Sequence, residues 1–285
     1  MELHCRNEHS ISRRFGLSGR SRLAAICASL ALFSGGTAMA ERPSHANEAP
    51  SAAAIRANDA GDDAFDRNDF TTALHQFTIA CDGRSAEGCF SLGALYSLGK
   101  GVTQDNIRAA KLYGTACDRG SIRACYNLGL LYQRGTGVAQ NIGTAISYWT
   151  KACNAGHASG CYMVAAMYKK GTGVAQNPAT AASYFAKACD AGDADGCLSL
   201  GASYDKGAGV AKNLATAVSY YVRACNAGSG DGCYNAGIFY HSGSGVAQSY
   251  DLAVGYFRRA LAINPNDKEA QADLASAERH RPAGN

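Results

Sequence analysis

The sequence predicts an all-α solenoid, in which helix–loop–helix hairpins stack one after another, and two observations lead to this fold class. The first is a pattern that returns every 36 residues without insertion, over residues 86–121, 122–157, 158–193, 194–229 and 230–265. The second is the spacing of apolar and small residues inside each unit, which follows the helical period. A fixed period of this length indicates an array built from one supersecondary unit.

The first helix of each unit is predicted from a tyrosine that follows a small residue by three positions and an apolar residue by four. Leu128, Gly129 and Tyr132 show this pattern. Spacings of three and four place side chains on one helical face. A Gly-x-Gly-Val element then ends the helix, because glycine readily takes the left-handed conformation that a helix C-terminus often needs. The tyrosines are Tyr96, Tyr132, Tyr168, Tyr204 and Tyr240.

The second helix of each unit is predicted to begin after a residue whose side-chain oxygen can cap a helix N-terminus. These residues are Asp105, Asn141, Asn177, Asn213 and Ser249. Pro178 follows Asn177 and suits the first helical position. Further along, an alanine precedes an aromatic pair such as Tyr148 and Trp149. We expect small residues to let the two helices approach closely and the aromatic residues to fill the gaps between units.

The full pattern of a unit is C-x-x-L-G-x-x-Y-x-x-G-x-G-V-x-x-[DN]-x-x-x-A-x-x-[YF]-[YFW]-x-x-A-C. It resembles Sel1-like repeats, and the cysteine pair makes the chain similar to the branch of Helicobacter cysteine-rich proteins. The resemblance covers residues 86–265. It implies a right-handed superhelix of αα-hairpins that is related to tetratricopeptide arrays.

Both ends of the array carry segments that fit as caps. Residues 58–85 resemble a tetratricopeptide hairpin, with a turn at Asn68-Asp69-Phe70 and a second helix that carries Ala73, Phe77 and Ala80. Residues 266–285 are predicted to form a capping helix and tail. Solenoids need terminal units with one hydrated face. Lys268, Glu269, Gln271, Asp273 and Glu278 supply that face.

Residues 1–40 are predicted to be a secretory signal peptide. Arginines precede the eleven-residue apolar run Leu23–Phe33, and Ala38-Met39-Ala40 predicts cleavage between Ala40 and Glu41. The apolar run is shorter than the ~20 residues of a membrane span, so no span is expected after signal removal. Residues 41–57 are predicted to be a linker. The mature protein is expected to be periplasmic or secreted.

Removal of the signal peptide changes the charge of the chain. The whole chain has a formal net charge of +4, and residues 1–40 carry five arginines against Glu2 and Glu8, a net +3, so about +1 remains. No basic stripe or stacking platform is left in the mature chain. The composition therefore argues against a nucleic-acid partner.

The cysteines of the mature chain come in pairs that lie eight residues apart and repeat every 36 residues. Bridges of spacing eight would join successive hairpins, and bridges of spacing 28 would join the helices of one hairpin. Ala53 and Leu261 occupy the outermost equivalent positions, so spacing 28 would leave Cys81 and Cys233 unpaired. We therefore predict one disulfide at each repeat junction: Cys81–Cys89, Cys117–Cys125, Cys153–Cys161, Cys189–Cys197 and Cys225–Cys233.

Metal binding is the rival interpretation of these cysteines. Zinc sites favour ligand spacings of two to four and four ligands together, whereas an exported protein meets an oxidising compartment. Disulfides are therefore favoured, with a need for disulfide-forming machinery during folding. A thiol oxidoreductase would favour Cys-x-x-Cys, which the sequence lacks. We predict neither a metal nor another cofactor.

The main functional prediction is an interaction scaffold that binds a protein or peptide partner, or an anionic envelope component, on a concave surface lined by the first helices. The chain shows no convincing catalytic constellation, and solenoid surfaces bind. The predicted binding residues vary between units and include a weakly basic strip. They are Asn127, Arg134, Lys169, Lys170, Lys206 and Asn235.

An enzymatic alternative follows from the resemblance alone. Some cysteine-rich members of the family are associated with β-lactam binding or hydrolysis, which implies a weak β-lactamase or a cell-wall amide hydrolase. Ser-x-x-Lys, a β-lactamase element, occurs at Ser97–Lys100 and at Ser203–Lys206. Neither Ser-Asp-Asn nor Lys-Thr-Gly accompanies it, so coincidence is the better interpretation of both matches.

Overall fold

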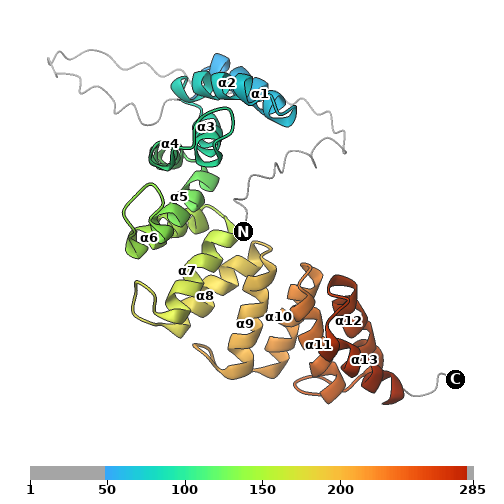
Figure 1. Cartoon of the computed structure of the whole chain (residues 1–285). Coiled ribbons are helices and arrows are strands. Elements are labelled where there is room, and N and C mark those ends of the chain that lie inside the picture. Colours follow the sequence, from blue (N-terminus) through green and yellow to red (C-terminus); the bar gives the residue numbers. More distant parts are fainter. Residues whose placement is uncertain (1–48, 281–285) are drawn as a thin grey trace, which may run out of the picture. The chain divides into compact units, whose positions relative to one another are not determined.

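The computed structural model describes residues 49–280, so the predicted signal peptide, its cleavage site at Ala40 and Glu41, and residues 41–48 of the predicted linker lie outside the described residues. The described part contains thirteen helices and no strand (Figure 1). None of these thirteen helices is long and apolar enough to cross a membrane. They are α1 (Ala52–Asp66), α2 (Phe70–Asp82), α3 (Ala86–Leu98), α4 (Asn106–Asp118), α5 (Ile122–Arg134), α6 (Ile142–Asn154), α7 (Ala158–Lys170), α8 (Pro178–Asp190), α9 (Ala194–Lys206), α10 (Leu214–Asn226), α11 (Gly230–Ser242), α12 (Tyr250–Ile263) and α13 (Lys268–His280).

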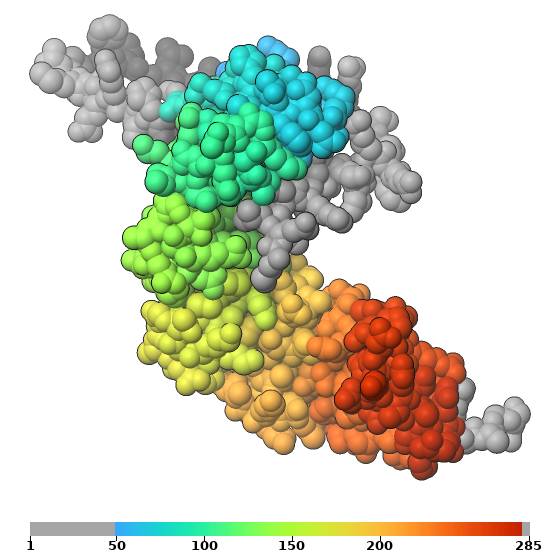
Figure 2. Space-filling view, viewed as in Figure 1, coloured from blue at the N-terminus to red at the C-terminus, as the bar shows by residue number. Residues whose placement is uncertain are grey.

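The helices form six hairpins, each made of an odd-numbered helix and the even-numbered helix that follows it, and α13 closes the array. Consecutive helices pack against each other throughout residues 52–280, and the hairpins follow one another in chain order (Figure 2). Odd-numbered helices of adjacent hairpins also touch, as α7 and α9 or α9 and α11 do. The predicted all-α solenoid of αα-hairpins is confirmed.

Glycines end the odd-numbered helices of the repeats as predicted. Gly135 follows α5 with φ of 69°, and its amide donates to the carbonyl of Leu131. The second glycine of the Gly-x-Gly-Val element has a further role. Gly137 also has a positive φ of 71°, and a Cβ there would collide with the backbone carbonyl of Asn106 in the preceding hairpin. The loop therefore packs tightly against the neighbouring repeat.

The predicted N-caps begin the even-numbered helices of the repeats. Asn141 Oδ1, for example, accepts from the backbone N–H of Thr144 at 3.0 Å. A second loop contact was not predicted from the sequence: Gln140 Nε2 donates to the carbonyl of Gln133 at 2.8 Å. Gln104, Gln176 and Gln248 make the equivalent bond in three other repeats. The loop between the two helices is thus held at both ends.

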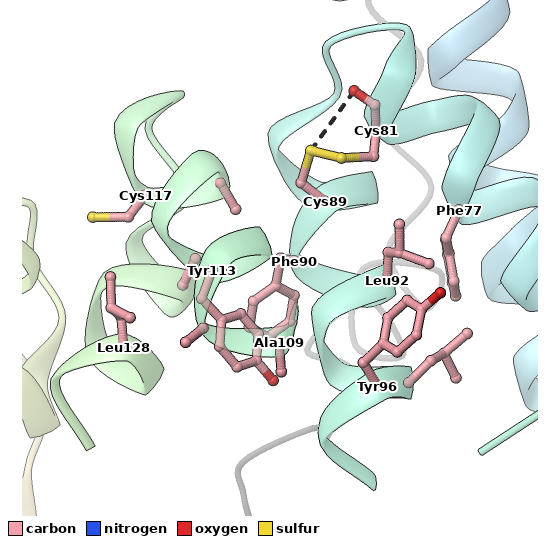
Figure 3. Close-up of a cluster of buried hydrophobic side chains, with 14 of the residues drawn as sticks. Phe77, Cys81, Cys89, Phe90, Leu92, Tyr96, Ala109, Tyr113, Cys117 and Leu128 are labelled. Atoms are coloured by element: carbon pink, nitrogen blue, oxygen red, sulfur yellow. Dashed lines mark hydrogen bonds between the residues drawn. A yellow bond between two sulfur atoms is a disulfide. The ribbon is translucent and has the colours of Figure 1, made fainter. Parts of the chain in front are cut away.

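Each hairpin is packed by one buried aromatic ring on a small residue. Trp149 is fully buried, its Nε1 donates to the carbonyl of Tyr126 at 3.2 Å, and a Cβ on Gly129 would overlap its ring. Tyr113 lies on Gly93 in the same way, close to Phe90 (Figure 3). The aromatic side chains therefore fill space inside each hairpin as well as between units.

The predicted linker extends too far toward the array. Helix α1 begins at Ala52, inside residues 41–57, and Ser51 caps it by accepting from the backbone N–H of Ala54 at 3.1 Å. Ala54 and Ala57 are buried. Alanine has the highest helix propensity, so a stretch whose composition resembles a linker forms a packed helix here. At the other end, α13 buries Ala270 and Ala277.

Candidate interaction face and its disulfide junctions

Five disulfides join even-numbered helices to the odd-numbered helices that follow them, and all five have the predicted spacing of eight. Figure 3 shows the first of them, Cys81–Cys89, between α2 and α3. All ten bridged cysteines are buried. The bridges are Cys81–Cys89, Cys117–Cys125, Cys153–Cys161, Cys189–Cys197 and Cys225–Cys233.

Cations from the next even-numbered helix cover several junctions, a feature that sequence reasoning missed. Arg223 donates to the carbonyl of Cys189 at 3.3 Å and to Asp190 Oδ1 at 2.8 Å. Arg259 reaches the carbonyl of Cys225 at 3.2 Å, one repeat later. The signal was present in the sequence, because a cation recurs every 36 residues at this helix position, as Lys151, Lys187, Arg223 and Arg259.

Three of the predicted binding residues occupy one position in three successive repeats. Arg134, Lys170 and Lys206 are the last residues of α5, α7 and α9, and all three are exposed. We call these three residues the basic row. None of them belongs to an ion pair formed among the described residues. Lys169 precedes the row in α7, with its Nζ 5.8 Å from the centre of the Phe185 ring.

The other two predicted binding residues differ in accessibility. Asn127 is only 2 % exposed, and its Nδ2 has no hydrogen-bond partner in the part of the chain that the structure describes. Asn235, three repeats later at the same helix position, is half-buried. The prediction took both side chains to be accessible to a partner. Only Asn235 offers accessible surface, so Asn127 is left out of the interaction face.

Stacked tyrosines link the two helices of four hairpins. The centres of the Tyr132 and Tyr148 rings lie 5.7 Å apart and the planes differ by 15°. Burial raises the pKa of Tyr148, and the neighbouring Tyr132 raises it further. In the first Sel1-like unit Leu112 replaces the second tyrosine, and the Arg108 guanidinium lies 4.3 Å from the centre of the Tyr96 ring. The other pairs are Tyr168–Tyr184, Tyr204–Tyr220 and Tyr240–Tyr256.

Residues of the two Ser-x-x-Lys matches make contacts unrelated to a serine–lysine pair. Lys100 Nζ lies 5.0 and 4.7 Å from the centres of the Phe65 and Phe70 rings. The Ser203 hydroxyl donates to the carbonyl of Ser199 at 2.9 Å, within its own helix. Within residues 49–280, no three His, Cys, Asp or Glu side chains are grouped so that they could hold a metal ion.

Comparisons with known proteins agree with this architecture. The Sel1 repeat family matches residues 86–121, 122–157, 158–193, 194–229 and 230–263. A Sel1 repeat protein from Oxalobacter formigenes is similar in structure, with a TM-score of 0.64, 25% identity, and coverage of 78% of this chain and 98% of that one. No curated protein sequence matches the chain significantly.

Two further solved structures are similar to the chain. A protective antigen of uropathogenic Escherichia coli with an SLR fold gives a TM-score of 0.69 at 23% identity, and the match covers 74% of this chain but only 44% of that protein. The Helicobacter pylori cysteine-rich protein B is 34% identical over 46% of this chain and 93% of its own, with a TM-score of 0.38. Because the repeat matches cover more than half of its length, the chain belongs to the Sel1 repeat family.

Proposed function

We propose that this protein is an exported interaction scaffold that holds an acidic, extended protein segment on the face formed by its odd-numbered helices. The observation that carries the proposal is the basic row, three exposed cations at one position of α5, α7 and α9. Sel1 repeat proteins are protein-interaction scaffolds. The proposal adds the face, the charge of the partner and the compartment.

The basic row differs from three cations on the even-numbered helices. A cation at a helix C-terminus is favoured by the helix dipole, and that alone accounts for a basic residue at the end of a helix. Lys151, Arg223 and Arg258, however, lie on even-numbered helices and are paired with carboxylates. The basic row keeps its charge available, since it takes part in no ion pair among residues 49–280.

The spacing of the row indicates the form of its ligand. Helices in contact lie about 8–10 Å apart, and α7 and α9 are in contact. An extended segment in the polyproline II conformation advances about 3.1 Å per residue with three residues per turn, so carboxylates three residues apart lie on one face, about 9 Å apart, and would face Lys170 and Lys206 together. The half-buried amide of Asn235 on α11 would bond the backbone of the same segment.

The disulfides support an exported location. All ten cysteines of the described part are joined in bridges, and such bridges persist in oxidising compartments such as the periplasm or the extracellular space. The signal peptide predicted for residues 1–40 is consistent with this location. The protein would depend on the disulfide-forming machinery of that compartment during folding.

No observation favours the β-lactamase-like alternative. The Lys100 ammonium lies on two aromatic rings, and the Ser203 hydroxyl is engaged with a carbonyl of its own helix. Neither contact joins a serine to the lysine three residues later. The scaffold therefore remains the proposed function.

The test is a pull-down from native envelope and culture fluid with three forms of the protein: wild type, the Arg134/Lys170/Lys206→Ala variant, and a control Lys111/Lys187/Lys212→Ala variant. The control removes the same number of positive charges from exposed positions on α4, α8 and a loop. A partner that binds the basic row is lost from the first variant, kept by the control, and eluted from wild type by salt. If all three forms retained the partner equally, the basic row would not be its binding site.

A cross-linking experiment tests the face independently of charge. A photoreactive amino acid at position 199 on α9, where the residue is half-buried, should capture the same partner. The same group at position 219, which is exposed on α10, should not. Capture from position 219 alone would assign the partner to the even-numbered helices and contradict the proposal.

A further inference from the structure

The first disulfide has an arginine within hydrogen-bond distance of one of its sulfurs, a contact that the structure shows at no other bridge of the described array. Arg119, which follows α4, donates from Nη1 to the carbonyl of Cys81 at 2.8 Å, and the same nitrogen lies 3.0 Å from Cys89 Sγ. An arginine beside a cysteine lowers the pKa of its thiol, because the cation stabilises the thiolate. In disulfide exchange, a sulfur with a lower thiol pKa leaves faster. Cys89 is therefore expected to be the better leaving group of this bridge, released as a thiolate.

Arginines at two other junctions provide the comparison. Arg223 reaches the carbonyl of Cys189 and Arg259 reaches the carbonyl of Cys225. Their remaining hydrogen bonds go to side-chain oxygens one residue further, Asp190 Oδ1 and Asn226 Oδ1. These arginines hold the backbone at the bridge and make no described hydrogen bond to a sulfur.

The loop that the first bridge closes is also strained. The third residue after the first cysteine of the other four pairs is a glycine, with φ between 90° and 96°: Gly120, Gly156, Gly192 and Gly228. The first loop has Arg84 at this position, with φ of 71°. The left-handed conformation is unfavourable for a residue with a Cβ. An open bridge would let this loop relax, whereas the glycine loops have no such strain to release.

The two sulfurs of the first bridge differ in access. Residue Cys81 is 7% exposed, more than any other bridged cysteine of the array, and Cys89 is 0% exposed. Arg119 lies on the Cys89 side of the bridge. The more exposed Cys81 is therefore the expected target of a nucleophile from solvent, and the sulfur that would leave is the one beside the guanidinium.

We propose that Cys81–Cys89 is a thiol-exchange site at which a protein dithiol acts while the other four bridges stay closed. One thiolate of the dithiol attacks Cys81 Sγ, so a mixed disulfide forms, the Cys81–Cys89 bond breaks and Cys89 leaves as a thiolate beside Arg119. The second thiol of the dithiol loses its proton to water and attacks the mixed disulfide. Cys81 is released as a thiolate that takes up a proton, and the dithiol becomes a disulfide. The exchange uncouples α2 from α3, and so the first hairpin from the Sel1 repeats.

The test measures how easily each bridge of the oxidised protein is reduced. The protein is equilibrated in a series of dithiothreitol redox buffers, free thiols are alkylated, and the ten cysteines are quantified by mass spectrometry. Cys81 and Cys89 should be alkylated together at the least reducing buffer, before any other pair. Reduction of all five pairs at one potential, or reduction of another pair first, would overturn the proposal.

Two variants distinguish the effect of the Arg119 guanidinium on bridge reduction from the effect of the strain at Arg84. Arg119→Met should lower the equilibrium constant for reduction of Cys81–Cys89 about tenfold, the factor that one unit of thiol pKa gives. Arg84→Gly should lower it about fivefold by removing the left-handed strain, and this substitution is also expected to preserve the fold. The matched control, Arg223→Met, removes a carbonyl contact without a sulfur contact and should leave Cys189–Cys197 unchanged. If the equilibrium constant for reduction of Cys81–Cys89 stayed at the wild-type value in Arg119→Met or in Arg84→Gly, that result would contradict the proposal.

Discussion

The interior of a hairpin and the junction between two hairpins are stabilised in different ways. Inside the hairpin, one large ring such as Trp149 lies on a glycine of the facing helix. At the junction, a disulfide, a loop glycine in close approach and, in several repeats, a cation from the next helix share the contact. The interior of a hairpin therefore depends on side-chain packing, whereas the junction depends on a disulfide and on close contacts between backbone segments.

This difference predicts how the array responds to damage. Solenoid stability is roughly the sum of local units and interfaces between neighbours. A change inside a hairpin should destabilise that unit, whereas a change at a junction should uncouple two units that each remain folded. The experiments below test this division, from the largest expected effect to the smallest.

Trp149→Ala should have the largest effect. The side chain is fully buried on Gly129, and its Nε1–H donates to the Tyr126 carbonyl. Removal of such a ring costs about 3–5 kcal/mol, because apolar contacts are lost and a cavity remains. Denaturant unfolding followed by circular dichroism gives the change in the free energy of unfolding. Ser147→Ala, at an exposed position of the same helix, is the control and should stay within about 0.5 kcal/mol of wild type.

Gly137→Ala and Gly156→Ala compare two junction glycines. Both have a positive φ, 71° and 91°, but a Cβ on Gly137 would collide with the Asn106 carbonyl, whereas nothing lies within 4 Å of one on Gly156. Gly156→Ala should cost only the left-handed strain of about 1–2 kcal/mol. Gly137→Ala should cost about 1–3 kcal/mol more, because the loop must move away from the preceding hairpin. Equal losses in the two variants would show that the close approach is unimportant.

The double variant Cys153→Ser/Cys161→Ser removes one central bridge without leaving a free thiol. The bridge closes a short loop, and the chain-entropy estimate gives a loss of about 2.5 kcal/mol. Because Trp149 remains in place, the loss should be smaller than that of Trp149→Ala.

Reduction of all five bridges should lower the melting temperature markedly while most of the helical circular dichroism remains. A complete loss of helix on reduction would refute the view that packing alone folds the hairpins.

Most of the hairpin could be predicted from the sequence, because its determinants repeat. The glycine that ends α5 and the asparagine that caps α6 are local signals, and five repeats with glycine at the first position and a capping residue type at the second removed ambiguity. The disulfide pairing followed from the ends of the array, where Ala53 and Leu261 replace cysteine. The stacking of Tyr132 on Tyr148 depends on how two helices face each other, so spacing along the chain did not reveal it.

Two other features escaped prediction for physical reasons. Asn127 is equivalent to the half-buried Asn235 in the sequence pattern, yet it is 2% exposed, because tertiary surroundings set burial and differ between copies. Helix α1 begins in an alanine-rich stretch that resembles a linker by composition alone. Asn127 departs from the periodic pattern and α1 lies outside it, so only the three-dimensional neighbours show the burial of either.

The smallest predicted effect concerns two aspartate N-caps, Asp193 at the α8–α9 junction and Asp69 in the loop of the first hairpin. The pKa values of these two carboxyl groups are shifted in opposite directions. Burial raises the pKa of Asp193, the N-cap of α9 whose Oδ1 accepts from the Gly196 amide at 2.7 Å, and the neighbouring Asp195 raises it further. Hydrogen bonds from Thr72, first through its side chain and then through its backbone N–H, lower the pKa of Asp69, the exposed N-cap of α2.

The consequences for stability have opposite signs. The folded state holds the Asp193 proton more tightly than the unfolded state does, so the Asp193 contribution falls as pH rises from the unfolded pKa through the raised folded value. The Asp69 contribution is present above the unfolded pKa and is lost as pH falls through the lowered folded value. Asn caps a helix as well as Asp does. Asp193→Asn should therefore slightly raise the unfolding midpoint at pH 7, and Asp69→Asn should slightly lower it.

Solvent screening keeps both effects small, so the comparison depends on their signs. Urea unfolding of the two variants and wild type at pH 3 and pH 7 measures them. At pH 3 protonation removes most of the charge of Asp193 in wild type, because its pKa is raised, so Asp193→Asn should approach wild type there. The difference between Asp69→Asn and wild type should narrow only as pH falls through the lowered pKa of Asp69. A shift of the same sign in both variants at pH 7 would mean that the substitution acts through cap geometry, and burial at the α8–α9 junction would then have no electrostatic consequence.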